Sequence, residues 1–319
     1  MNTVNKARTN PSWKIRFWAV VKYELLWNIR KKKFIGTVIL AFVFTTLGLV
    51  LPVALSNMAG ESVSQNPDYI ISSGIGSIGY FLFALVTVMN SISGEFESGT
   101  IVPLLTKPVS RTMVFLGKLF AAFIIILSVN VVLFVYGAIG ATAVYGPQNN
   151  LYLIPLLFLG GIISTFVWIA IVLAIGSLSK SSLIAAIGAF GIFMALLISA
   201  PIVSLFSDQA RILTYVPGSG ATGYIVGLGP QTIYTRGMSA STGTDNIAAN
   251  LVTYVLHPSV EVSFFTISGF SGEQISWGSP LYKESLSLVL LRSIIVAATY
   301  ILVFLFISWY AFKRAQILE

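Results

Sequence analysis

Two glutamates, Glu95 and Glu97, are the first residues whose type and spacing could do chemistry. Paired carboxylates can serve as general acid and base, but residues two apart on a helix point to nearly opposite sides and would not flank one substrate. A charged carboxylate at the centre of a bilayer costs roughly 2.5–3.5 kcal/mol on insertion scales. We therefore expect both at the cytoplasmic mouth of a membrane domain, binding backbone N–H groups or basic partners in a structural or coupling role.

A second candidate is the sequence Gly269-Phe-Ser271-Gly272, which matches a short pattern found around some intramembrane serine nucleophiles. In that class the serine begins a membrane helix and a histidine comes from a later helix. Here the single histidine, His257, precedes Ser271 in the same polar stretch. Chance occurrence in a chain rich in Ser and Gly is the better account of the pattern, and an intramembrane protease stays only the third alternative.

Several other kinds of site are excluded or disfavoured by residue content. The chain has no cysteine and one histidine, so it has neither thiolate ligands nor a histidine cluster for a metal. The phosphate-binding loop G-x-x-x-x-G-K-[ST] is absent, because Gly117-Lys118 is followed by Leu119 and lacks the upstream glycine. We predict no catalytic residues and no cofactor or metal in this chain.

Composition indicates a membrane protein. Of the 319 residues, 56 % are hydrophobic and 9 % charged, with mean hydropathy +0.87. Apolar runs of about 20 residues can cross a hydrocarbon core of roughly 30 Å. The runs predict six transmembrane helices in an all-α integral membrane fold, over residues 34–55, 69–92, 113–145, 151–178, 183–206 and 288–312. The net charge of +8 would suggest nucleic acid in a soluble chain, but here orientation explains it and no nucleic acid is expected.

The distribution of Lys and Arg predicts the orientation. Nine basic residues precede Phe34, whereas the short loops 56–68 and 146–150 contain none. Because short loops rich in Lys and Arg stay in the cytoplasm, both termini are predicted to be cytoplasmic. Lys118 and Arg292, each near one end of a span, are expected to extend their charged groups to the surface.

Residues 12–33 combine Trp and Tyr with Lys and Arg, the residue types that favour the headgroup layer. We predict an interfacial helix on the cytoplasmic leaflet, with an unstructured basic stretch as the alternative.

The stretch from Gly94 to Lys118 is the passage around which the chain is organised. Thr100 can cap a short helix, and Pro108 can end it by disfavouring helix at the residue before it. Leu104 and Leu105 give that helix an apolar face with no local partner. Ser110 can cap a second helix that continues into the next span. A short helix with exposed leucines at the mouth of a membrane domain suits docking to another protein.

This stretch resembles the type-2 ABC permease family, the membrane subunits of ABC exporters whose ATPase is a separate polypeptide. The resemblance is carried by the pattern Glu95-x-Glu97-x-Gly99-Thr100, Leu104-Leu105-x-x-Pro108-x-Ser110-Arg111 and Gly117-Lys118. It implies a cytoplasmic coupling helix at 95–112, between spans 2 and 3, that docks in the ATPase subunit. It also implies an N-terminal elbow helix in which Glu24 and Arg30 match the family's acidic residue and arginine.

The resemblance implies a permease of an ATP-driven exporter in the cell (plasma) membrane, with ATP and Mg²⁺ bound by the partner. Two ATPase subunits and a second permease, identical or related, are the expected partners in the lipid bilayer. The alternative from another class is a secondary transporter or channel, which would want ionisable groups in mid-span or inverted repeats. The transported substrate is open.

The expected organisation has four parts: a cytoplasmic N-terminus at 1–33, spans 1–5 at 34–206, an extracytoplasmic segment at 207–284, and span 6 with the tail at 285–319. The 207–284 segment is rich in Gly, Pro and Ser, and its fold is left open. Within it, residues 247–262 are expected to form a helix interrupted at His257-Pro258.

Overall fold

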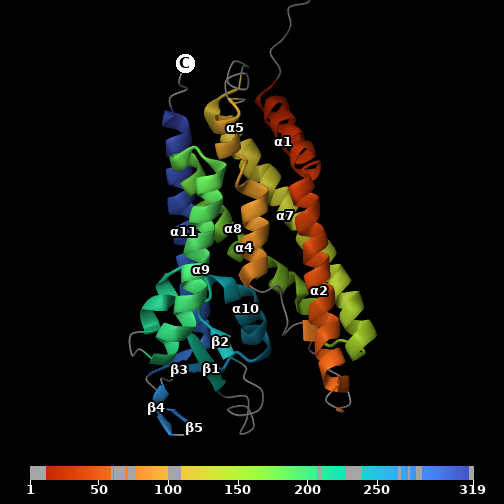
Figure 1. Cartoon of the computed structure of the whole chain (residues 1–319), viewed down its shortest axis with the longest axis vertical. Coiled ribbons are helices and arrows are strands. Elements are labelled where there is room, and N and C mark those ends of the chain that lie inside the picture. The colour runs from red at the N-terminus through yellow and green to blue at the C-terminus, as the bar shows by residue number, and fades with distance from the viewer. Residues whose placement is uncertain are drawn as a thin grey trace, which may run out of the picture.

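The fold is seen in a computed structural model of the whole chain (Figure 1). The structure describes residues 12–58, 60, 69–70, 77–99, 109–206, 210–226, 239–264, 267–271, 274–277 and 282–315. Its α-helices are α1 (Trp13–Ile29), α2 (Lys32–Met58), α4 (Ser77–Val88), α5 (Ser93–Glu97), α7 (Arg111–Tyr145), α8 (Ile154–Ser179), α9 (Ser182–Phe206), α10 (Ile247–Leu256) and α11 (Leu286–Arg314). Short 3₁₀ helices are η1 (Leu151–Leu153), η2 (Ala210–Tyr215) and η3 (Thr244–Asn246).

Five of the described helices are long and apolar enough to cross a membrane, over Phe34–Met58, Arg111–Tyr145, Leu151–Ser179, Ser182–Ser204 and Leu286–Arg314. They coincide with five of the six expected spans. The remaining span, expected at 69–92, contains α4, but residues 71–76 lie outside the described ranges. The mostly helical architecture is therefore confirmed, and the six-span layout stays a prediction.

Helix α8 is the centre of the bundle, packed by α4, α9, α10 and α11. It is apolar on all sides, as expected of a helix surrounded by protein. Its Trp168 is fully buried and meets the rings of Phe81 from α4 and Phe193 from α9 at 5.3 and 5.2 Å. Helix α2 lies at the periphery, and along its apolar part only 6 % of residues are buried.

Strands are present in the segment whose fold the sequence left open. A sheet of antiparallel strands has the order β2 (Ser239–Ser241), β1 (Thr222–Val226), β3 (Glu261–Phe264) and β6 (Tyr282–Ser285). A separate pair joins β4 (Ile267–Ser271) to β5 (Gln274–Trp277). The expectation for 247–262 is half correct: α10 ends at Leu256, just before His257-Pro258, but the chain then forms β3 instead of more helix.

The two ends of the molecule differ in structure (Figure 1). Figure 1 shows α1, α5 and the end of α11 at one end, and the strands with α10 at the other. Residue 285 of β6 runs directly into α11, so the sheet is joined to the last long helix without a linker. The described residues of the expected coupling stretch in α5, Glu95 and Glu97, therefore lie at the end opposite the sheet (Figure 1).

Candidate functional site

Lys118 forms a buried ion cluster with two glutamates from different helices. Its Nζ lies 2.5 Å from Oε1 of Glu24 in α1 and 2.7 Å from Oε1 of Glu95 in α5. The Lys118 side chain is 3 % exposed. The expectation that it extends to the surface is therefore wrong. Two carboxylates within hydrogen-bond reach offset the cost of removing the ammonium from water, so the side chain turns inward.

The cluster contains two carboxylates and one ammonium group. Glu95 is the carboxylate whose hydrogen bonding is incomplete. Its second oxygen, Oε2, is buried without a hydrogen-bond partner among the described residues. Burial raises the pKa of Glu95 above its ordinary value, while the nearby Lys118 ammonium opposes that shift. Glu95 is thus the electrostatically strained member of the cluster.

Glu97 binds on the other side of α5. Its Oε1 accepts hydrogen bonds from the Ser182 backbone N–H at 2.8 Å and from Ser181 Oγ at 2.9 Å, and its Oε2 accepts one from Ser182 Oγ. These donors lie at the start of α9, and they hold the pKa of Glu97 below its ordinary value. Glu95 and Glu97 therefore bind opposite sides, a basic group and a helix start, as their spacing predicts.

Two glycines permit these contacts. Gly99 follows α5 with φ +67, a left-handed conformation that glycine adopts without strain and that ends the helix. At Gly117 in α7, an added Cβ would lie 2.7 Å from Cγ1 of Val20 in α1. The missing side chain lets α1 and α7 approach closely, and that approach brings Glu24 within reach of Lys118.

Arg111 binds the end of the last long helix. Its Nη1 donates to the backbone oxygens of Lys313 at 2.9 Å and Ala315 at 2.8 Å. Such carbonyls lack partners within a helix, so a guanidinium there caps α11. Ser110 precedes Arg111 and accepts a hydrogen bond from the Met113 N–H at 3.1 Å, which confirms the predicted cap of α7.

The expected coupling helix is described only at its two ends. Glu95, Glu97 and Gly99 precede the segment 100–108, and Arg111 follows it. Thr100, Leu104, Leu105 and Pro108 lie outside the described residues, so the helix predicted there stays a prediction. What the structure brings together is the set of anchors on both sides of that segment.

A family model described as "ABC-2 family transporter protein" matches residues 18–317. The chain belongs to the ABC-2 transporter family. It is a multi-pass membrane protein and the permease of an ABC transporter. A search of curated proteins finds no match. The matched range runs from α1 to the tail after α11 and includes every expected coupling residue.

In this ABC-2 permease, Glu24 and Arg30 lie in different surroundings. Glu24 is buried in the Lys118 cluster, whereas Arg30 is exposed where α1 ends. The N-terminal segment is thus helical over Trp13–Ile29, and its placement in the headgroup layer stays a prediction. Ser181 and Ser182, which bind Glu97, were not among the expected site residues, because nothing local in a four-residue polar turn marks a partner 84 positions away.

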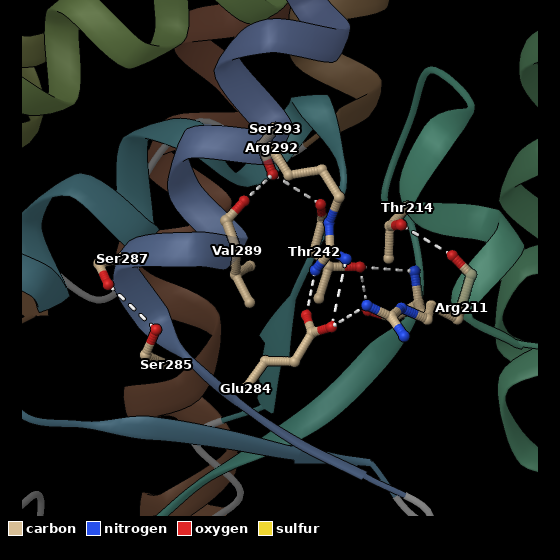
Figure 2. A network of polar contacts seen from close by, with 10 residues as sticks. Arg211, Thr214, Thr242, Glu284, Ser285, Ser287, Val289, Arg292 and Ser293 are labelled. Carbon is tan, nitrogen blue, oxygen red and sulfur yellow. Dashed lines mark hydrogen bonds and ion pairs between the residues drawn. The ribbon is translucent and has the colours of Figure 1, made fainter.

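A second ion cluster lies at the opposite end of the permease (Figure 2). Figure 2 shows the Glu284 carboxylate facing the guanidinium groups of Arg211 and Arg292. Arg211 Nη2 is 2.9 Å from Glu284 Oε1, and Arg292 pairs with Oε2. Burial, and next the Glu284 charge, raise the pKa of nearby Tyr282 to about 12. Arg292 was expected to reach the surface, but its side chain is only 14 % exposed.

Neither end offers a metal site, since no group of three or more His, Asp or Glu residues gathers in the described ranges. Ser271 and His257, the residues of the possible serine site, belong to different elements. Ser271 is the last residue of β4, and His257 is the C-cap of α10.

Proposed function

We propose that this permease is the transmembrane subunit of an ATP-driven exporter and that ATP is hydrolysed by a separate ABC ATPase. The segment 95–112 docks into the ATPase, and ATP-driven closure of the ATPase pair displaces it. The spans joined to that segment then open a path for the cargo. The chain itself holds neither ATP nor Mg²⁺ and is not catalytic.

One observation carries the proposal: the described residues on both sides of 100–108 are bonded to four different long helices. Glu95 reaches α1 and α7 through the Lys118 cluster. Glu97 caps α9, and Arg111 caps α11. A displacement of the segment would therefore act on four helices at once. Coupling in thermodynamic terms requires that the ATPase bind one arrangement of these helices more tightly than another.

The assembly in this proposal has two permeases, identical or related, and two ATPase subunits in the cell membrane. Both permease termini are cytoplasmic, which puts α5 and the Lys118 cluster on the ATPase side and the sheet outside. The strands lie between α9 and α11 in the sequence. Because α11 crosses the bilayer once and ends at the cytoplasmic C-terminus, its first residues, and the sheet joined to them, lie outside.

Site-directed cross-linking tests the docking, because the natural chain contains no cysteine. Leu104→Cys is expected to cross-link to a co-expressed ABC ATPase through a short bifunctional thiol reagent. Asn150→Cys, in the turn after α7, is the matched control and should remain uncross-linked while a membrane-impermeant maleimide labels it in intact cells.

Affinity purification in mild detergent provides the second arm. The tagged chain should retain an ABC ATPase, and changing Leu104 and Leu105 to Asn should abolish retention without loss of membrane insertion. If no ATPase is retained and transport by reconstituted vesicles follows a proton gradient without ATP, the chain is a secondary transporter and the proposal is wrong.

A further inference from the structure

An apolar pocket lies between the first two helices and α7, away from the contacts described above. Its volume is about 310 Å³, within the size range of small-ligand pockets. It is lined by residues of α1 and α2 on one wall and of α7 on the other: Leu25, Ile29, Phe34, Val38, Phe42, Ile124, Ile125, Ser128, Val129 and Val132. Ile29 and Val132, each 51 % exposed, make its rim accessible from outside.

The pocket lies between two places where α7 contacts the first two helices. Between those two places the helices are further apart. Toward the start of α7, Gly117 lets Val20 of α1 approach closely. Further along, the hydroxyls of Thr46 in α2 and Tyr136 in α7 are 2.7 Å apart. Between these contacts the backbone turns at Arg30–Lys31, where α1 ends and α2 begins. Because the rim is exposed, a molecule from the surroundings of the bundle can enter this space.

The chemistry of the walls selects a hydrocarbon occupant. Ser128 is the only lining residue with a polar side chain, and its hydroxyl already donates to the Ile124 backbone oxygen at 2.8 Å. A polar ligand would therefore lose hydrogen bonds with water and find only the Ser128 hydroxyl oxygen as a side-chain acceptor here. The pocket suits an acyl chain.

The charge at one edge selects an anionic headgroup. Ile29 and Phe34 line the pocket, and the four residues between them are Arg30-Lys31-Lys32-Lys33. Arg30 and Lys32 are exposed, and Lys31 Nζ lies 5.7 Å from the centre of the Trp27 ring. Glu24 is the only acidic residue in the first 60 positions, and it is bonded to Lys118 in the interior. Lys31 is close enough to Glu95 to interact with its charge, so the anionic headgroup is assigned to the exposed Arg30 and Lys32.

We propose that this pocket binds one acyl chain of an anionic phospholipid whose phosphate group lies against Arg30 and Lys32. Phe34 begins the long apolar part of α2, so the basic residues lie where the hydrocarbon core gives way to headgroups. The lipid fills the gap between α1–α2 and α7. This inference needs only the membrane location of the chain and is independent of any ATPase.

Native mass spectrometry of the purified full chain, titrated with phosphatidylglycerol and phosphatidylcholine of identical acyl chains, tests the site. The wild-type chain should retain phosphatidylglycerol in preference. Arg30→Gln with Lys32→Gln should weaken phosphatidylglycerol retention by about fivefold for each basic residue removed. Lys14→Gln with Lys313→Gln removes the same charge elsewhere and should leave the preference unchanged.

A pocket-filling variant tests the apolar part. Ser128→Phe should lower retention of both lipids by about tenfold, because it occupies the volume of several methylene groups. Val135→Phe, on the same face of α7 two turns further on and 55 % exposed, is the matched control and should have no effect. If Ser128→Phe lowers the unfolding temperature, Val132→Trp at the rim makes the same test.

Three results would overturn the proposal. The first is equal retention of the two lipids by the wild-type chain. The second is equal lipid binding by the pocket and control variants. The third is a change from dimer to monomer in Ser128→Phe with lipid retention intact, which would assign the pocket to a contact between permease copies.

Discussion

The two ion clusters of this permease have opposite composition, and only the second contains a largely exposed member. At the α5 end, one ammonium lies between two carboxylates, with side-chain exposures of 3 % for Lys118, 4 % for Glu24 and 17 % for Glu95. At the sheet end, one carboxylate lies between two guanidinium groups, and Arg211 is 58 % exposed. A buried excess charge cannot be relieved by water, whereas Arg211 can be hydrated in place. Breaking the first cluster should therefore cost more than breaking the second.

The largest effect is expected for Lys118→Met, which would leave Glu24 and Glu95 buried without a counter-ion. Removing one partner of a buried ion pair costs about 3–5 kcal/mol. We expect a strongly lowered unfolding temperature in detergent, measured by loss of the monodisperse peak after heating. Adding Glu24→Gln and Glu95→Gln to Lys118→Met should recover most of the loss, since no charge is then left buried. If the triple variant is as unstable as the single one, packing and not charge explains the site.

A smaller effect is expected for Glu284→Gln at the sheet end. Two guanidinium groups lose their shared acceptor, but the exposed Arg211 regains water, so the cost falls to about 1–3 kcal/mol. The same heating assay measures it. A loss as great as that of Lys118→Met would contradict the ranking by burial that the two clusters suggest.

Within the sheet-end cluster, the two arginines should differ. Arg211→Gln removes an ion pair that is largely hydrated, and such pairs contribute about 0–1 kcal/mol. Arg292 is 14 % exposed, and burial is what distinguishes it, because each arginine lies over a tyrosine ring, Arg292 at 5.8 Å from Tyr215 and Arg211 at 5.5 Å from Tyr282. We expect Arg292→Gln to lower the unfolding temperature more than Arg211→Gln. High salt should narrow the difference between wild type and Arg211→Gln only, because screening acts on exposed charges.

Features that are determined by nearby residues could be predicted from the sequence, whereas features that depend on distant residues could not. The long spans were predicted because the length of an apolar run is set by bilayer thickness. The cap at Ser110 and the end of α10 at His257-Pro258 were equally local. The strand at 261–264 was missed, because it is stabilised by pairing with β1 and β6, and strand formation depends on such neighbours more than on intrinsic preference.

The ion clusters were missed for the same reason. Lys118 and Glu24 are 94 positions apart, and Arg111 and the Lys313 carbonyl 202 apart. A lysine near a span end favours the surface unless partners are available inside. For Lys118 those partners are Glu24, brought close by the packing of α1 against α7, and Glu95 from α5. Glu24, Glu95, Arg111 and Lys118 were identified through the family pattern, but which groups they bind could not be read from their spacing, and the sheet-end cluster was not predicted at all.

The smallest effect is expected for Glu97→Gln, which changes an exposed carboxylate outside both ion clusters. Its hydrogen bonds lower its folded-state pKa below the ordinary 4.5, so they stabilise the native state fully above pH 4.5. That contribution is lost as pH falls from 4.5 through the lower folded pKa. The difference in unfolding temperature between wild type and Glu97→Gln should thus be constant from neutral pH down to pH 4.5 and shrink below it. With Ser181→Ala and Ser182→Ala as background, only the backbone donors of residues 182 and 183 remain, and the difference should be smaller at every pH. A difference that grows in acid would mean that Glu97 is protonated more readily in the folded state, and that the start of α9 does not hold its charge.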